Sequence, residues 1–138
     1  MIKVFDAYAV LCWLQEEPGA NYVNNLMAKA EQKALEILIS PINIGEIYYC
    51  LVKSGYNHLA ASFLSDVKKR KFPWRIAPVS NGRVWHAARL KAQYRISYAD
   101  AFAVGLAKET GGEIVTRDPE IIEASRGGGF IVDVIPVE

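Results

Sequence analysis

Four acidic residues lie in apolar stretches of the sequence, where charged side chains are scarce. They are Asp6, Glu46, Asp100 and Asp118. A carboxylate among Val, Ile, Ala and Tyr costs free energy unless it is paired, hydrogen-bonded or bound to a cation, and no matching set of Lys or Arg lies beside these four in the sequence. A shared divalent metal ion would remove that cost. Because oxygen-only ligands select hard cations, we expect Mg²⁺ or Mn²⁺ as the cofactor.

Hydrolysis of a phosphodiester is the chemistry that such a site would serve. A divalent cation lowers the pKa of bound water, which then attacks phosphorus, and it neutralises charge on a phosphoryl oxygen. His58 and His86 are isolated in the sequence, so we expect neither to act as a metal ligand or a base. The all-carboxylate set also lacks the nitrogen and sulfur donors that zinc prefers.

Helix capping is the simpler explanation for three of these acids. Asp6 and Asp118 each precede a predicted helix, and Asp100 follows Ser97 at capping-box spacing. Glu46 fits the explanation only if Asn43, rather than Ser40, caps its helix. The set of four favours a functional site over caps alone, because negative charges gathered at one rim would repel each other without a cation.

The elements that must position the acids alternate between strand and helix. We expect strands at 2–5, 35–39, 75–79, 113–116 and 130–135. Helices are expected at 7–15, 20–33, from Pro41 to Ser54-Gly55, at 57–70, from 80 or 81 to about 94, from the region of Ala99 to Gly111, and from 119 to about 124, with a turn at 127–129. This order predicts a three-layer α/β/α fold with a mostly parallel central sheet, as a single domain over 1–138.

Within such a sheet, ligands collect beyond the carboxyl ends of the strands. Asp6 and Asp118 each follow a predicted strand directly, and Glu46 lies in the helix that follows a third strand. The topology therefore predicts that the acids converge.

Composition excludes several classes of protein. The net charge of +1 gives no overall basic field for a nucleic acid. Cys12 and Cys50 lie in apolar helical patterns without CxxC spacing, so we expect buried, reduced thiols and a cytoplasmic protein. No cleavable leader and no membrane-spanning run is apparent. Lys68 to Lys71, with Phe72 and Trp74, could contact RNA, although a charged helix end followed by core aromatics is the commoner meaning.

Five motifs contain or flank the four acids. They are Val4-Phe5-Asp6-Ala7-Tyr8-Ala9-Val10-Leu11, Glu17-Pro18-Gly19, Asn43-Ile44-Gly45-Glu46-Ile47-Tyr48, Ser97-Tyr98-Ala99-Asp100-Ala101 and Thr116-Arg117-Asp118. Together they resemble the PIN-domain family, and in particular the VapC toxins of type II toxin-antitoxin systems. The resemblance implies a small endoribonuclease that hydrolyses RNA with Mg²⁺ or Mn²⁺, is silenced by a cognate antitoxin and forms a homodimer.

The same resemblance assigns roles to individual residues. Asp6, Glu46, Asp100 and Asp118 match the family's metal-site and catalytic positions. Thr116 matches a hydroxyl residue that supports the first acid, and Glu120 is a candidate peripheral carboxylate. Tyr8 departs from the pattern, because many members have Ser or Thr two residues after the first Asp.

Other functions fit parts of the sequence. The same fold could serve RNA processing without an antitoxin, or the chain could be a non-catalytic α/β binding module that uses its acids as caps. A phosphorylated signalling receiver also gathers acids around Mg²⁺, but its adjacent acids near the first strand and its late Lys are not clear here. A DxD phosphohydrolase is disfavoured because Tyr8 occupies the place of the second Asp.

Overall fold

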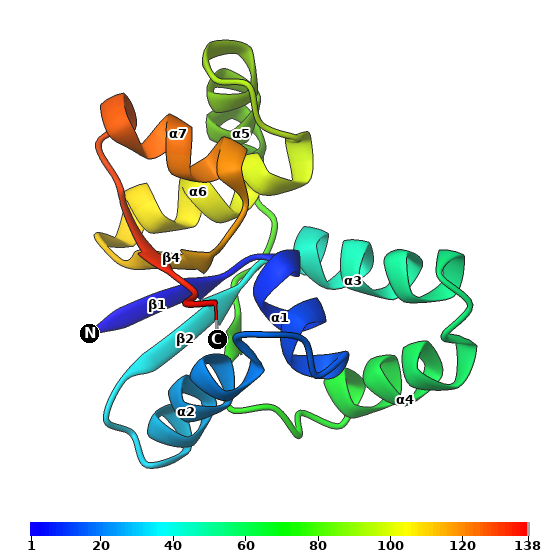
Figure 1. Ribbon diagram of the computed structural model, residues 1–138. Coiled ribbons are helices and arrows are strands. Elements are labelled where there is room, and N and C mark those ends of the chain that lie inside the picture. Colours follow the sequence, from blue (N-terminus) through cyan, green and yellow to red (C-terminus); the bar gives the residue numbers. More distant parts are fainter. Residues whose placement is uncertain (138) are drawn as a thin grey trace.

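A five-stranded parallel sheet forms the middle layer of the computed structural model, which describes residues 1–137 (Figure 1). The strand order is β3-β2-β1-β4-β5. The strands are β1 (Ile2–Phe5), β2 (Glu36–Ile39), β3 (Arg75–Ile76), β4 (Glu113–Thr116) and β5 (Ile131–Val134). Every pair of neighbouring strands is parallel. The predicted three-layer α/β fold is therefore confirmed, and its sheet is parallel throughout rather than mostly so.

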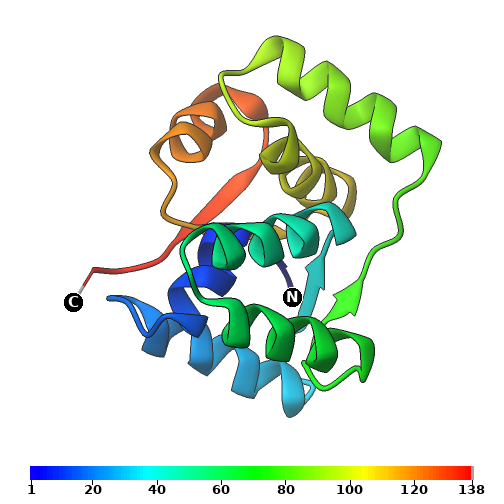
Figure 2. The ribbon, with the colours of Figure 1, turned by 90° about the vertical axis from the view of Figure 1, so that its right-hand side faces the viewer.

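Seven helices of the described chain cover the two faces of the sheet. One layer contains α1 (Ala7–Leu14), α2 (Ala20–Glu31), α3 (Pro41–Lys53) and α4 (Asn57–Lys68), and the other contains α5 (Asn81–Gln93), α6 (Tyr98–Thr110) and α7 (Pro119–Gly128) (Figure 1). Figure 2 shows α3 and α4 lying side by side as a pair. Each strand reaches the next through helices, as parallel pairing requires.

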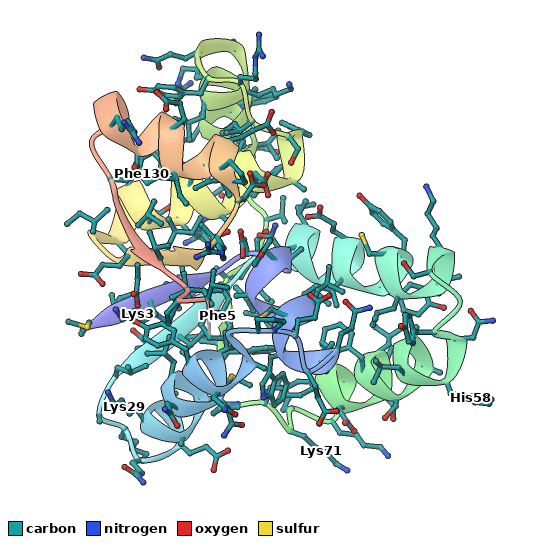
Figure 3. All side chains as sticks on the ribbon, viewed as in Figure 1. Lys3, Phe5, Lys29, His58, Lys71 and Phe130 are labelled. Carbon is teal, nitrogen blue, oxygen red and sulfur yellow. The ribbon has the colours of Figure 1, made fainter. Side chains whose placement is uncertain are left out.

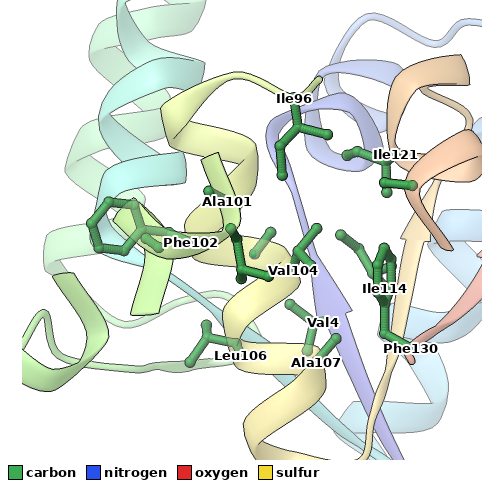
Figure 4. Packing of buried hydrophobic residues seen from close by; sticks show 14 of the residues in the cluster. Val4, Ile96, Ala101, Phe102, Val104, Leu106, Ala107, Ile114, Ile121 and Phe130 are labelled. Atoms are coloured by element: carbon green, nitrogen blue, oxygen red, sulfur yellow. The ribbon is translucent and has the colours of Figure 1, made fainter. Parts of the chain in front are cut away.

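Residues of the central strands alternate between the two layers. Val4 of β1 and Ile114 of β4 pack with α5, α6 and α7, whereas their neighbours Phe5 and Val115 pack with α1 to α4. Figure 4 shows Val4 and Ile114 against the apolar side of α6. A period of two is the geometry of a strand, and here both faces are apolar because helices cover both. The buried strands thus hold the acid-bearing helices in place.

Two predicted elements differ from the structure. β3 is only two residues long instead of covering 75–79, and Pro78 cannot donate a ladder hydrogen bond. The predicted turn at 127–129 is wrong, since α7 continues to Gly128. Gly129 caps the helix in the left-handed conformation, with a φ of 72°. A side chain does not fit at position 128, because a Cβ there would lie 2.7 Å from the Phe130 ring. The glycine therefore lies within the helix despite its weak helix propensity.

Smaller differences concern helix ends and one cysteine. α2 and α4 stop two residues before the predicted ends at 33 and 70, a shift typical of fraying termini. Both cysteines are free, and Cys12 is buried as expected, but Cys50 is only half-buried. Across residues 1–137, none of the helices has both the length and the apolar character needed to cross a bilayer.

A buried lysine joins three strands of the sheet. Lys3 Nζ lies 2.6 Å from Glu113 Oε1 on β4 and 2.8 Å from Asp133 Oδ2 on β5. Tyr22 of α2 donates its hydroxyl to the other oxygen of Asp133 at 2.5 Å. Burial lowers the pKa of Lys3, but the hydrogen bonds and charges of its two partners outweigh burial and raise that pKa overall. Figure 3 shows Lys3 on the sheet, before Phe5 in β1. The sequence patterns did not predict this network.

We expect Lys3→Met to destabilise the protein by about 3 kcal/mol, because it leaves two partly buried carboxylates without their cation. Urea unfolding followed by circular dichroism measures the change. Arg75→Met is the matched control: Arg75 pairs with Glu36 on the exposed edge of the same sheet at 3.0 Å, and such surface pairs contribute about 1 kcal/mol or less. Equal losses for the two variants would contradict a special role for Lys3.

Candidate functional site

Asp6 lies at the carboxyl end of the central strand β1 and caps the helix that follows. Its Oδ1 accepts a hydrogen bond from the Ala9 N–H at 2.9 Å, which satisfies one of the free amides at the start of α1. The side chain is only 1% exposed, and its second oxygen, Oδ2, has no well-formed hydrogen bond. The predicted cap is therefore present, yet it uses one carboxylate oxygen and leaves the other free in the interior.

Asp118 reaches the same edge of the sheet because β4 pairs directly with β1. It caps α7, with Oδ1 accepting from the Glu120 N–H at 2.8 Å. Thr116, the last residue of β4, is fully buried, and its Oγ1 accepts from the Asp118 N–H at 3.1 Å. The Thr116 hydroxyl also acts on the Asp6 carboxyl, whose pKa it lowers. Thr116 thus contacts both aspartates.

Asp100 lies in the first turn of α6, which begins after Ser97. The Ser97 Oγ accepts a hydrogen bond from the Asp100 N–H at 3.0 Å, so Ser97 is the cap and the Asp100 side chain is not needed for that role. Asp100 is 8% exposed. The capping-box spacing therefore explains the start of the helix but not the burial of this carboxylate.

Glu46 lies in the second turn of α3, because Ser40 caps this helix through the Ile42 N–H at 3.2 Å. Capping therefore does not explain Glu46. Its Oε1 is buried and lacks a hydrogen-bond partner. Glu46 is thus the second acid of the set with an unsatisfied buried oxygen.

Asn43 is a site residue that our sequence reasoning considered only as an alternative cap. It is fully buried, and its Nδ2 donates to the Ala99 carbonyl of α6 at 3.2 Å, while its Oδ1 has no partner. Asn43 also acts on Glu46, whose pKa its side chain lowers. The available signal was spacing, since residues three apart share a helix face and Asn43 precedes Glu46 by three.

Burial and neighbouring acids raise the pKa values of Asp6, Asp100 and Glu46. Burial raises the pKa of Asp6 to about 7, with the charges of Asp100 and Asp118 adding to the effect. Burial likewise raises the pKa of Asp100 to about 7, followed by the charge of Asp118 and, more weakly, of Glu46. The pKa of Glu46 is raised first by burial and then by Asp118. The fold thus brings together the four residues that the sequence singled out.

Their arrangement suits a hard cation in its donor atoms, although it is not a closed ligand set. Across residues 1–137, no three His, Cys, Asp or Glu side chains are arranged so that they could hold a metal ion as they stand. The ion pairs formed within that part of the chain also leave these four acids without a Lys or Arg partner. Two buried carboxylate oxygens without hydrogen bonds, Asp6 Oδ2 and Glu46 Oε1, are the donors that Mg²⁺ or Mn²⁺ would satisfy.

Other candidates from the sequence lie outside this cluster. Glu120 is exposed at the start of α7. Figure 3 places His58 and Lys71 at the periphery, far from Phe5 at the end of β1. Trp74 and Phe72 stack against each other with ring centroids 4.5 Å apart. These aromatic rings pack in the core layer of α1 to α4, in agreement with the commoner meaning of that segment.

A family comparison decides the relationship of the chain. The family model described as the PIN domain matches residues 3–127. The chain belongs to the PIN domain family. The resemblance seen in the motifs is therefore confirmed. A search of the curated proteins found no match.

Solved structures share this PIN fold over nearly their whole length. VapBC2 from Rickettsia felis, bound to a DNA fragment from its promoter, is 23% identical, with 97% of this chain and 98% of that chain covered and a TM-score of 0.72. VapC20 from Mycobacterium tuberculosis, a sarcin-ricin loop cleaving toxin, is 18% identical, with 99% and 100% covered and a TM-score of 0.75. DNA-bound VapBC from Salmonella typhimurium is 15% identical, with 99% of each chain covered and a TM-score of 0.70. These likenesses concern the fold.

The buried acids make the metal-free protein sensitive to pH. Between the ordinary Asp pKa of 3.8 and about 7, folded Asp6 and Asp100 retain protons that the unfolded chain has released. The free energy of unfolding therefore falls as pH rises through this window and stays low above it. We expect Asp6→Asn, which keeps a capping oxygen, to be more stable than the parent at pH 8 in EDTA by roughly 2 to 4 kcal/mol.

Chemical unfolding at pH 4 and pH 8 measures this difference, which should shrink at pH 4. Asp66→Asn is the control, since it removes the same formal charge from an aspartate on α4 that is paired with Lys71 at 3.7 Å. A parent whose stability in EDTA is flat between pH 4 and 8 would show that burial does not raise these pKa values in solution.

Proposed function

We propose that the chain is a metal-dependent endoribonuclease that hydrolyses RNA phosphodiesters with Mg²⁺ or Mn²⁺, and that it acts as the toxin of a VapBC-type toxin-antitoxin pair. One observation carries the proposal. In a PIN-domain chain, two buried carboxylate oxygens without partners, on Asp6 and Glu46, lie in a cluster with two further acids at the carboxyl edge of the sheet. A cation is the partner that these oxygens lack.

Asp6, Asp100 and Asp118 are the residues that would hold the cation, and Glu46 would hold or orient the water bound to it. When bound, the cation would neutralise charge on a phosphoryl oxygen and lower the pKa of water. Each carboxylate comes from a different element, and two are fixed by capping hydrogen bonds through their other oxygen. Such anchoring orients ligands before substrate arrives, which limits the reorganisation needed during reaction.

Glu46 Oε1 is the group that we assign to proton removal from the attacking water. Its pKa is raised by burial, and a base is most effective when its pKa lies nearer the working pH. Asn43, tied to α6 through the Ala99 carbonyl, orients this side chain. Thr116 acts in the same way on Asp6 and Asp118.

The toxin role, the antitoxin partner and the homodimer belong to the proposal as well. The toxin role and the antitoxin partner are supported by the folds of the VapBC complexes from Rickettsia felis and Salmonella typhimurium, which align with nearly all of this chain. The homodimer rests on the family resemblance of the motifs. An RNA-processing nuclease without an antitoxin would use the same acids and the same chemistry. A co-expressed small protein that binds this chain and blocks cleavage would favour the toxin role.

The rival from another class is a non-catalytic module whose acids serve as caps. The caps formed by Asp6 and Asp118 favour it. It does not account for Asp100 or Glu46, whose helices are capped by Ser97 and Ser40. This rival predicts neither metal binding nor cleavage.

We expect purified, antitoxin-free protein to cleave structured RNA with Mg²⁺ or Mn²⁺ and to leave 5′-phosphate and 3′-hydroxyl ends. Asp100→Asn should lower the cleavage rate by 100-fold or more, roughly the loss seen on removing one group that stabilises a transition state. Asp66→Asn should cleave like the parent. Full activity of folded Asp100→Asn, read by sequencing of the cut ends, would remove Asp100 from the site.

Mn²⁺ should also stabilise the protein in the absence of RNA. At a concentration 100 times its Kd, a ligand that binds only the folded state adds about 2.7 kcal/mol, so the melting temperature should rise by several degrees. The rise should be smaller for Asp6→Asn and unchanged for Asp66→Asn. Thermal scans in EDTA and in Mn²⁺ measure it, and an equal rise for all three proteins would point to binding elsewhere.

A further inference from the structure

We propose that Tyr8 and Tyr49 are base-stacking residues that hold unpaired nucleotides of an RNA substrate beside the acid cluster. This inference rests on the nuclease function proposed above. It assigns a role to two exposed rings, on two different helices, that the hydrolytic chemistry does not use.

Tyr8 lies in the first turn of α1, two residues after Asp6, and is 41% exposed. Asp6 is the cap of this helix and Tyr8 is its second residue, so the ring lies within one turn of that carboxylate. Partial burial raises the pKa of the Tyr8 hydroxyl, followed by Cys12, Glu17 and, most weakly, Asp6, while the charge of Arg117 lowers it. Arg117 is half-buried and donates from Nη1 to the Ile135 carbonyl at 2.9 Å. The Arg117 guanidinium, fixed by this hydrogen bond, thus provides a positive charge near Tyr8.

Tyr49 lies beside an acid of the cluster on α3. It follows Glu46 by three residues, so the two side chains share one helix face. The ring is 51% exposed. The charge of Glu46 is the largest cause that raises the pKa of Tyr49, and Asp100 also contributes. α1 and α3 pack against each other, and Asp118 acts on both Asp6 and Glu46, so Tyr8 and Tyr49 each adjoin an acid of the same cluster.

Stacking is the form of binding that this rim suits. Four acids repel the phosphates of an approaching strand, and a net charge of +1 supplies no general attraction. A neutral aromatic face binds any nucleobase by stacking, because every base has a π-face, and this attraction does not depend on the charge of the protein. In a duplex the faces of the bases are already stacked, so rings at the rim would select unpaired nucleotides. Tyr98, although 44% exposed, already packs edge-to-face on Phe102 at 5.2 Å.

The test measures binding of a fluorescein-labelled 12-nucleotide RNA of mixed, unstructured sequence to the full chain in EDTA, by anisotropy. We expect Tyr8→Leu and Tyr49→Leu each to weaken binding by about 5- to 100-fold, the range for loss of one stacked base. Tyr8→Phe and Tyr49→Phe keep the ring and should bind like the parent. Tyr56→Leu is the matched control, because Tyr56 is 49% exposed at the start of α4, beyond the far end of α3.

The outcomes separate this inference from the nuclease proposal. If the parent protein binds and cleaves RNA and the Leu variants bind RNA equally well, the stacking role alone is overturned. Parent protein that neither binds nor cleaves any RNA would remove both proposals. Leu variants that change the sedimentation mass of the protein instead of its RNA affinity would assign the two rings to a protein interface and overturn the inference. The inference is supported if the parent protein binds the same RNA more weakly after the RNA is annealed to its complement, and if the Leu variants do not change the affinity for that duplex.

Discussion

The gathering of four carboxylates at one largely buried edge of the sheet is the constraint on which the rest of this structure depends. Asp6 and Asp100 are almost wholly removed from water, and burial contributes more to their raised pKa values than their neighbours do. A fold that keeps such groups together without cationic partners gives up stability at neutral pH. A divalent cation that completed the cluster would offset this cost, because it would neutralise the buried carboxylates in place of bound water and protons.

Capping and a functional role for the aspartates are compatible, since a carboxylate has two oxygens. In Asp6 one oxygen accepts from the Ala9 amide and the other is unsatisfied. The cap fixes the side chain on a helix that itself starts at the strand end, so the free oxygen has a defined direction. A residue that looks like an ordinary helix start in the sequence can therefore serve a site that depends on rigid placement.

The two ends of the sheet differ in whether their carboxylates have a cationic partner. At the amino end of β1, Lys3 neutralises Glu113 and Asp133, and Tyr22 completes the network. At the carboxyl end, the four acids form no ion pair with a Lys or Arg of residues 1–137. The ion pairs of Lys3 tie β1, β4 and β5 together, and β1 and β4 are the strands that lead into Asp6 and Asp118. The exposed rings of Tyr8 and Tyr49 adjoin two of these acids in the chain.

The sequence by itself determined the fold class, the order of elements and the four acids, because apolar periodicity, caps and charges in apolar runs are local signals. It also predicted that Ser40 begins α3, which places Glu46 beyond the capping turn. Only the tertiary structure decided that β4 lies next to β1, that Asn43 bonds to α6 and that Lys3 is buried between two acids. These features depend on contacts between residues far apart in the chain, and local patterns carry no record of which distant partner a side chain will meet.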